Sequence, residues 1–122
     1  MSKRILVIED TEDNRQIIRD LLTSFDYELI EAVDGAEGVA MAETHRPDLI
    51  LMDIQLPVVD GYEAMRHIRA IPELATVPIV AVTSYDLSGD EAKTREAGCD
   101  GYIAKPFSPR QLLAKVREFL PE

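Results

Sequence analysis

Carboxylate side chains follow two strongly apolar segments of the sequence. Glu9 and Asp10 come directly after one of them, and Asp53 closes the other. A third apolar segment ends in Thr83, and a fourth ends in Lys105. Carboxylates, a hydroxyl and an ammonium group, if brought to one place, would suit a divalent cation together with a phosphoryl group. The chemistry therefore depends on whether the fold gathers these five side chains.

Apolar segments of strand length alternate along the chain with segments of helical period, which is typical of an α/β fold. The expected strands are residues 4–9, 28–33, 48–53, 77–83 and 101–104. Nearly unbroken runs of Val, Ile and Leu predict parallel strands that are covered on both faces. With right-handed crossovers, the pattern predicts a doubly wound, flavodoxin-like (βα)5 fold: a five-stranded parallel sheet of order 2-1-3-4-5 with five helices.

In such a sheet the carboxyl ends of the strands share one edge, and ligands bind where the strand order reverses. Here that point lies between the first and third expected strands, which are the two that end in acids. We therefore expect the five polar side chains to converge on one cleft at this edge.

Each expected helix has a candidate capping residue followed three positions later by Glu or Gln, a pattern that satisfies free N–H groups at a helix start. The pairs are Asp13 with Gln16, Asp34 with Glu37, Asp60 with Glu63, Ser88 with Glu91, and Ser108 with Gln111. In the first helix, an apolar stripe is expected to face the core. This stripe comprises Ile17, Ile18, Leu21, Leu22 and Phe25.

Three neighbouring carboxylates repel one another unless a proton or a cation intervenes. Mg²⁺ is a suitable cation, because it prefers oxygen ligands and keeps several waters. The predicted ligands are Glu9, Asp10 and Asp53, with the backbone carbonyl of Gln55, two residues past Asp53, completing the set. Alternatively, acids at strand ends are simply solvated loop residues, an interpretation that the placement of Asp53, Thr83 and Lys105 at corresponding strand ends makes less attractive.

A carboxylate can also accept a phosphoryl group and form an aspartyl-phosphate. Asp53 is the predicted acceptor. The transferred group carries negative charge on three oxygens, so catalysis depends on positioning and electrostatics. Mg²⁺ can neutralise one oxygen, the ammonium of Lys105 can reach another, and the Thr83 hydroxyl can donate a hydrogen bond to the third.

The same residues resemble the receiver domain of the response regulators of two-component signalling, of the chemotaxis-receiver type and with a single domain. The matching segments cover essentially the whole chain: Ile8-Glu9-Asp10, Leu51-Met52-Asp53-Ile54-Gln55-Leu56-Pro57, Asp60-Gly61, Val82-Thr83-Ser84 and Tyr102-Ile103-Ala104-Lys105-Pro106-Phe107. Each segment is common by itself, but their order and spacing together are highly specific.

The resemblance implies that Asp53 takes a phosphoryl group from a sensor histidine kinase, a histidine phosphotransfer protein or a small phosphodonor. It implies that Asp10 and the Gln55 carbonyl bind Mg²⁺ directly, with Glu9 acting mainly through water. Such a domain is a signalling switch that catalyses only its own phosphorylation and dephosphorylation, and it is not an enzyme with separate substrates.

The resemblance also implies a switch, in which Thr83 moves to the phosphoryl group and the Tyr102 ring moves inward behind it. The Lys105–Pro106 peptide bond would be cis, as X–Pro bonds tolerate. A downstream protein target would bind the surface formed by the fourth helix, the fifth strand and the fifth helix. Tyr85 departs from the commonest pattern; its ring either slows hydrolysis of the aspartyl-phosphate or points to solvent.

Two other functions remain open from the residues alone. A Mg²⁺-dependent phosphohydrolase could use the same Asp nucleophile, but such enzymes of the haloacid-dehalogenase type have a second Asp where this chain has Gln55. An FMN-binding, flavodoxin-like module would need a phosphate loop rich in Ser, Thr and Gly after the first strand. The segment Glu9-Asp10-Thr11-Glu12-Asp13 is acidic instead.

The chain has 122 residues, a formal net charge of −10 and one cysteine. This length predicts a single domain over residues 1–122, which the resemblance implies is a receiver domain, and no output domain is expected. The negative charge argues against direct binding to nucleic acid or anionic membranes. No segment approaches the ~20 apolar residues of a membrane helix, and a lone thiol fits a reducing compartment, so a cytoplasmic location is expected.

Overall fold

The computed structural model describes residues 3–54, 61–83, 98–104 and 107–120. Five strands form one parallel sheet in the order β2-β1-β3-β4-β5. Their bounds are β1 Arg4–Ile8, β2 Glu28–Ala32, β3 Leu49–Asp53, β4 Ile79–Thr83 and β5 Gly101–Ala104. The predicted strand positions and the order 2-1-3-4-5 are therefore confirmed.

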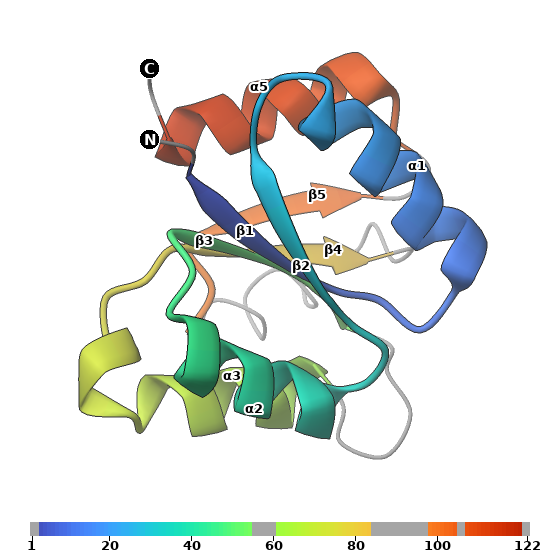
Figure 1. Cartoon of the computed structure of the whole chain (residues 1–122). Coiled ribbons are helices and arrows are strands. Elements are labelled where there is room, and N and C mark those ends of the chain that lie inside the picture. The colour runs from blue at the N-terminus through green and yellow to red at the C-terminus, as the bar shows by residue number, and fades with distance from the viewer. Residues whose placement is uncertain (1–2, 55–60, 84–97, 105–106, 121–122) are drawn as a thin grey trace.

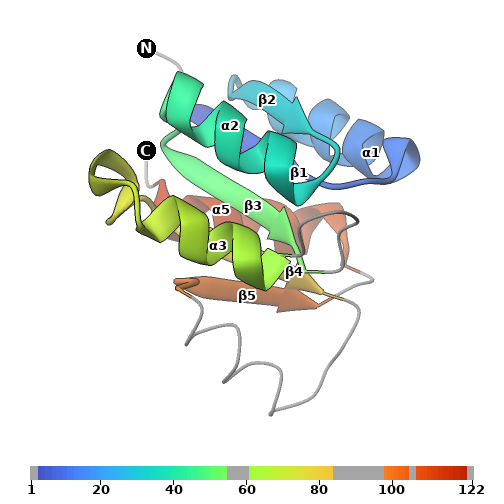
Figure 2. The same ribbon diagram turned by 90° about the horizontal axis from the view of Figure 1, so that it is seen from below.

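Helices cover both faces of this sheet (Figures 1 and 2). Those described are α1 Glu12–Thr23, α2 Gly35–His45, α3 Gly61–Arg69 and α5 Pro109–Phe119, with a short 3-10 helix at Pro72–Leu74. α1 and α5 lie on one face, and α2 and α3 lie on the other. The fourth expected helix falls outside the described residues. Among the described helices, none is both long and apolar enough to cross a membrane.

The alternation of side chains along β1 divides the core into two parts. Ile5 and Val7 pack with α1 and α5, whereas Leu6 and Ile8 pack with α2 and α3. All four side chains are buried. Both faces of the strand are therefore apolar, which explains why its sequence is a continuous apolar run and does not alternate with polar residues.

Two of the predicted capping pairs occur as expected. The Asp34 carboxylate accepts a hydrogen bond from the Glu37 N–H at 2.8 Å. Ser108 and Gln111 form a reciprocal capping box, with Pro109 at the first helical position. The pairs that begin at Asp60 and Ser88 fall outside the described residues.

The prediction for the start of the first helix is wrong. α1 begins at Glu12, its N-cap is Thr11, and no side chain caps it. Asp13 therefore lies in the first turn, where a carboxylate favours the positive end of the helix dipole without capping it. The apolar stripe is also narrower than predicted: Ile18 and Leu22 are buried, but Ile17 is 54% exposed.

Phe25 lies just beyond α1 and is likewise exposed. The guanidinium group of Arg117 in α5 lies over the Phe25 ring, with the guanidinium carbon 5.2 Å from the ring centroid. A cation over an aromatic face is attracted by the ring quadrupole, so this pair joins the two helices at the surface.

Candidate functional site

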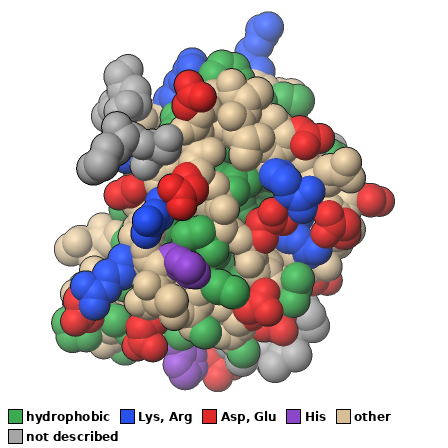
Figure 3. All heavy atoms as spheres, viewed as in Figure 1, with side chains coloured by type: hydrophobic (Ala, Val, Ile, Leu, Met, Phe, Trp, Pro, Cys, Tyr) green, Lys and Arg blue, Asp and Glu red, His purple; other side chains and the backbone are tan. Residues whose placement is uncertain are grey.

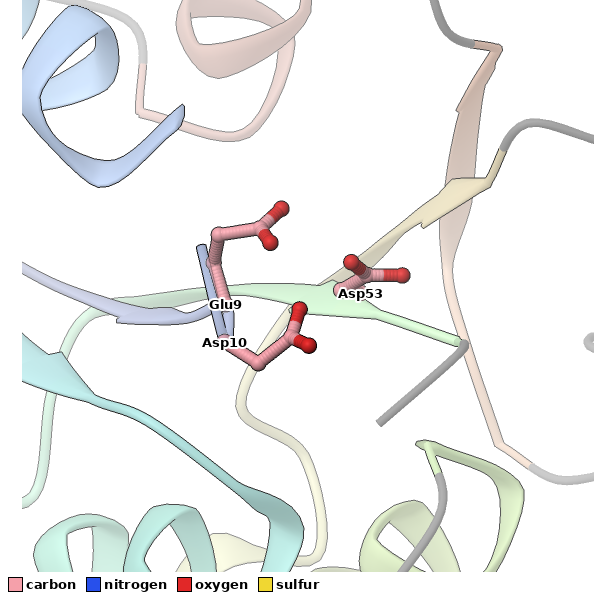
Figure 4. A group of neighbouring side chains, drawn as sticks. All are labelled: Glu9, Asp10 and Asp53. Atoms are coloured by element: carbon pink, nitrogen blue, oxygen red, sulfur yellow. The ribbon is translucent and has the colours of Figure 1, made fainter. Parts of the chain in front are cut away.

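The sheet register brings three carboxylates together. β1 and β3 are adjacent, and Ile8 is paired with Met52. The residues that follow these partners, Glu9 and Asp10 after β1 and Asp53 at the end of β3, therefore emerge at the same edge. Figure 4 shows their carboxylate groups gathered beyond the two strands. One carboxylate oxygen from each lies within 4.8 Å of the others.

The three carboxylates differ in their exposure to solvent. Glu9 and Asp53 are 3% and 4% exposed, whereas Asp10 is exposed. Buried like charges at this separation repel one another, and a hard divalent cation would relieve that repulsion. The donor set consists of oxygen atoms with one side open to water, which fits Mg²⁺. An ion would approach from the side of Asp10, because this carboxylate is exposed to solvent.

Three hydrogen bonds restrain Glu9, two through its backbone and one through its carboxylate. Its N–H donates to the Ala32 carbonyl of β2 at 3.0 Å. Its carboxylate accepts from the Thr11 N–H at 3.1 Å. Its own carbonyl oxygen accepts from Nη1 of Arg15 at 2.8 Å. The position of the first acidic residue is thus set by β2 and by α1 together.

Gly61 allows α3 to begin next to the phosphoacceptor candidate. Its N–H donates to the Ile54 carbonyl at 3.0 Å. A Cβ atom at this position would lie 2.6 Å from the Asp53 carbonyl oxygen and 2.6 Å from the Ile54 Cα. Glycine is needed here because the helix approaches the backbone of Asp53 closely. The motif Asp60-Gly61 was recognised in the sequence, but this physical reason for it was not.

Thr83 closes β4, the strand beside β3. It follows Val82, which is paired with Asp53, so Thr83 comes at the same edge of the sheet as the carboxylates. Tyr102 is half-buried in β5 and lines an open surface pocket of about 480 Å³ beside β5 and α5, together with Gln111 and Lys115. Gln55, Lys105, Pro106 and Tyr85 lie outside the described residues.

Four charged residues form an ion-pair cluster between α1 and β2. We call Glu12, Arg15, Arg19 and Glu31 the α1–β2 charge cluster. Figure 3 shows basic and acidic side chains side by side in this region. Hydrogen bonds from Arg19 lower the pKa of Glu31, although its partial burial opposes the shift. Hydrogen bonds from Arg19 and Arg15 likewise lower the pKa of Glu12.

Arg15 was not among the residues predicted from the sequence to matter at the site. A signal was nevertheless present, because Arg15 precedes Ile18 by three positions and Leu22 by seven. That spacing places it on the buried face of α1. Its side chain is 11% exposed, and a charged side chain in such a place requires partners.

Comparisons with known proteins agree with this geometry. The profile of the response regulator receiver domain matches residues 5–117. The polar-differentiation response regulator DivK of Brucella anthropi is 41% identical over 120 residues, which are 98% of each chain. The receiver domain of a sensor histidine kinase from Pseudomonas aeruginosa is 38% identical, with a TM-score of 0.92 and 100% of both chains covered. That crystal structure has a magnesium ion coordinated in its active-site cleft.

A chemotaxis response regulator of Vibrio cholerae is more distant in sequence, at 28% identity, yet its TM-score is 0.94 over 98% of this chain and 99% of its own. Sequence profile, full-length relatives and fold therefore lead to the same family, which the sequence motifs had indicated. The chain belongs to the response regulator receiver domains of two-component signalling.

Proposed function

We propose that this receiver domain is a Mg²⁺-dependent phosphorylation switch with Asp53 as the acceptor of the phosphoryl group. The observation that carries the proposal is the convergence of Glu9, Asp10 and Asp53, whose carboxylate oxygens lie within 4.8 Å of one another at the carboxyl ends of β1 and β3. The phosphodonor is a sensor histidine kinase or a histidine phosphotransfer protein, and the domain acts in the cytoplasm.

The candidate ligands of Mg²⁺ are Asp10, Asp53 and the Gln55 carbonyl, with Glu9 acting mainly through water. When bound, Mg²⁺ supplies positive charge that offsets the carboxylates and one oxygen of the phosphoryl group. The magnesium ion in the Pseudomonas aeruginosa receiver domain supports this choice of cation. Glu9 and Asp53, being buried, hold their oxygens in place, and the exposed Asp10 leaves one side open.

The covalent chemistry of the transfer is a single exchange of bonds at phosphorus, so positioning and compensation of charge carry the catalysis. A carboxylate oxygen of Asp53 forms a bond to phosphorus while the P–N bond of the donor's phosphohistidine breaks, and the imidazole leaves with the electron pair. Water later hydrolyses the resulting acyl phosphate, which restores the carboxylate and releases inorganic phosphate. The Lys105 ammonium and the Thr83 hydroxyl stabilise the other two phosphoryl oxygens.

The signal leaves the domain through protein contacts. Thr83 shifts toward the phosphoryl group, and the Tyr102 ring moves inward behind it. The surface formed by the fourth helix, β5 and α5 then changes shape for a downstream target. The half-buried position of Tyr102 in β5, at an open pocket shared with α5, supports this role, because the ring belongs to the surface that a target would bind.

Phosphotransfer from a kinase tests the proposal. Histidine kinases of the source organism, autophosphorylated with radiolabelled ATP, are each mixed with the wild-type protein and with Asp53→Asn. At least one kinase should transfer its label rapidly to the wild type and not to the variant. Equal labelling of Asp53→Asn by that kinase would remove Asp53 from the acceptor role.

A further inference from the structure

The guanidinium group of Arg15 reaches from α1 to the backbone of the carboxylate site. Its Nη1 donates to the Glu9 carbonyl oxygen at 2.8 Å. Its Nε lies 3.3 Å from a carboxylate oxygen of Glu31 in β2, and its Nη2 is paired with Glu12 in the first turn of α1. One side chain therefore contacts the end of β1, the start of α1 and a strand of the sheet.

The acceptor of the Nη1 hydrogen bond matters because of the peptide unit to which it belongs. The Glu9 carbonyl and the Asp10 N–H share one rigid plane. A hydrogen bond from a charged donor to this carbonyl fixes the orientation of the plane, and with it the direction in which the Asp10 side chain leaves the backbone. Asp10 is the exposed member of the carboxylate group, so fewer packing contacts are available to orient it.

The guanidinium is itself held in place by acids on both sides. Glu31 and Glu12 fix two edges of the planar group and leave Nη1 directed at the Glu9 carbonyl. A guanidinium can satisfy these three partners at once because its donors form a rigid fork, whereas the ammonium of Lys would be a single point charge.

We propose that Arg15 is a positioning residue for the cation site, which orients the Glu9–Asp10 peptide so that Asp10 meets Mg²⁺ correctly. This inference rests on the proposed function for its Mg²⁺ readout. It assigns to the α1–β2 charge cluster a role in metal binding as well as in stability.

Arg19 offers a matched control within the same cluster. It donates to both oxygens of Glu31, at 2.7 and 2.8 Å, and to Glu12 at 3.1 Å. It therefore shares both acidic partners with Arg15 but is not hydrogen-bonded to Glu9. If the cluster only ties α1 to β2, then Arg15→Gln and Arg19→Gln should behave alike at the metal site.

The first test is calorimetric titration of Mg²⁺ into the wild type, Arg15→Gln and Arg19→Gln, with urea unfolding measured alongside. Arg15→Gln should weaken Mg²⁺ binding about tenfold, as removal of a group that orients a metal ligand typically does. Arg19→Gln should remain near the wild-type affinity even though it loses stability. Equal Mg²⁺ affinities of the two variants would overturn the proposal.

The second test needs no metal. Hydrogen exchange in EDTA should be faster at the Asp10 and Thr11 amides in Arg15→Gln than in Arg19→Gln, because the peptide plane is released. Arg15→Lys, which keeps a charge beside the two acids, should fold stably and still show the faster exchange. Unchanged exchange at these amides in both Arg15 variants contradicts the proposal. If the wild type binds no Mg²⁺, the proposed function fails, and the exchange measurement still decides the role of Arg15.

Discussion

At the scale of single residues, the site depends on a close approach between Gly61 and the backbone of Asp53. In Gly61→Ala the new methyl group would have to displace the Asp53 carbonyl or the Ile54 backbone, since both lie 2.6 Å from its position. We expect a loss of about 1–3 kcal/mol in the free energy of unfolding, together with weaker Mg²⁺ binding, because Asp53 itself must shift.

Gly101→Ala is the control for that prediction. A Cβ there would meet the Phe119 ring at 2.8 Å, so this variant is also overpacked. Gly101, however, is the first residue of β5, so it lies at the amino ends of the strands, away from the carboxylates at their carboxyl ends. Urea unfolding and Mg²⁺ titration of both variants should show a loss of stability in each and a loss of affinity in Gly61→Ala alone. Unchanged affinity in Gly61→Ala would show that the close approach does not position Asp53.

The sequence revealed the acidic residues of the site but not the residues that orient them. Glu9, Asp10 and Asp53 could be predicted because strand ends in a parallel sheet share an edge, and the register of β1 and β3 confirms their meeting. The contact between Arg15 and the Glu9 carbonyl could not be predicted, because it depends on where α1 begins and on how the helix is rotated against β2.

At the scale of secondary-structure elements, the α1–β2 charge cluster makes stability depend on pH. Arg19 holds the pKa of Glu31 below its ordinary value of 4.5. A carboxylate with a lowered folded-state pKa contributes stability that is fully present above its unfolded pKa and is lost as the pH falls through the folded value. Glu31→Gln should therefore cost about 1 kcal/mol at neutral pH, and this difference should shrink as the pH falls below 4.5.

The measurement is urea unfolding of the wild type and Glu31→Gln between neutral pH and the acid range, at low salt. Glu28→Gln is a suitable control in the same strand, because Glu28 is paired only with the exposed side chain of Arg4, at 3.5 Å, among the ion pairs of the described residues. A stability difference for Glu31→Gln that stays constant through the acid range would show that the ionised carboxylate is not its source.

Helix starts were predictable where the capping group acts locally. The Asp34 and Ser108 caps are formed by residues three positions apart, so the sequence alone indicates them. The start of α1 is different, because the Thr11 N–H donates to the Glu9 carboxylate. A residue of the functional site thus participates in the approach to the helix, and the local pattern at Asp13 predicted the wrong starting residue.

At the scale of the whole molecule, the two ends of the parallel strands have different roles. The acids lie at the carboxyl ends of the strands, whereas Arg69, at the end of α3, holds together the segments at their amino ends. Its guanidinium donates to the carbonyl oxygens of Leu74, Ala75, Val77 and Gly98 and to the Asp100 carboxylate. These acceptors precede β4 and β5, so one side chain holds the connections that lead into both strands.

Arg69→Met should therefore lower the free energy of unfolding by about 2 kcal/mol or more, because several acceptors lose a charged donor. Mg²⁺ affinity should change little, since the carboxylates lie at the carboxyl ends of the strands. Arg66→Met, at an exposed position one turn earlier in α3, should have a small effect. Urea unfolding measures the stability of both variants, and a parallel Mg²⁺ titration measures their affinity. Similar losses of stability in Arg69→Met and Arg66→Met would show that the hydrogen bonds of Arg69 do not stabilise the fold.

The role of Asp53 and Mg²⁺ is tested by the mass of the intact protein after treatment with acetyl phosphate, with Mg²⁺ or with EDTA. One added phosphoryl group is expected in the wild type with Mg²⁺, because the carboxylates admit an anion only when a cation offsets their charge. No added group is expected with EDTA, and none in Asp53→Asn under either condition. Equal phosphorylation of the wild type in EDTA, or of Asp53→Asn with Mg²⁺, would show that Mg²⁺ or Asp53 does not have the proposed role.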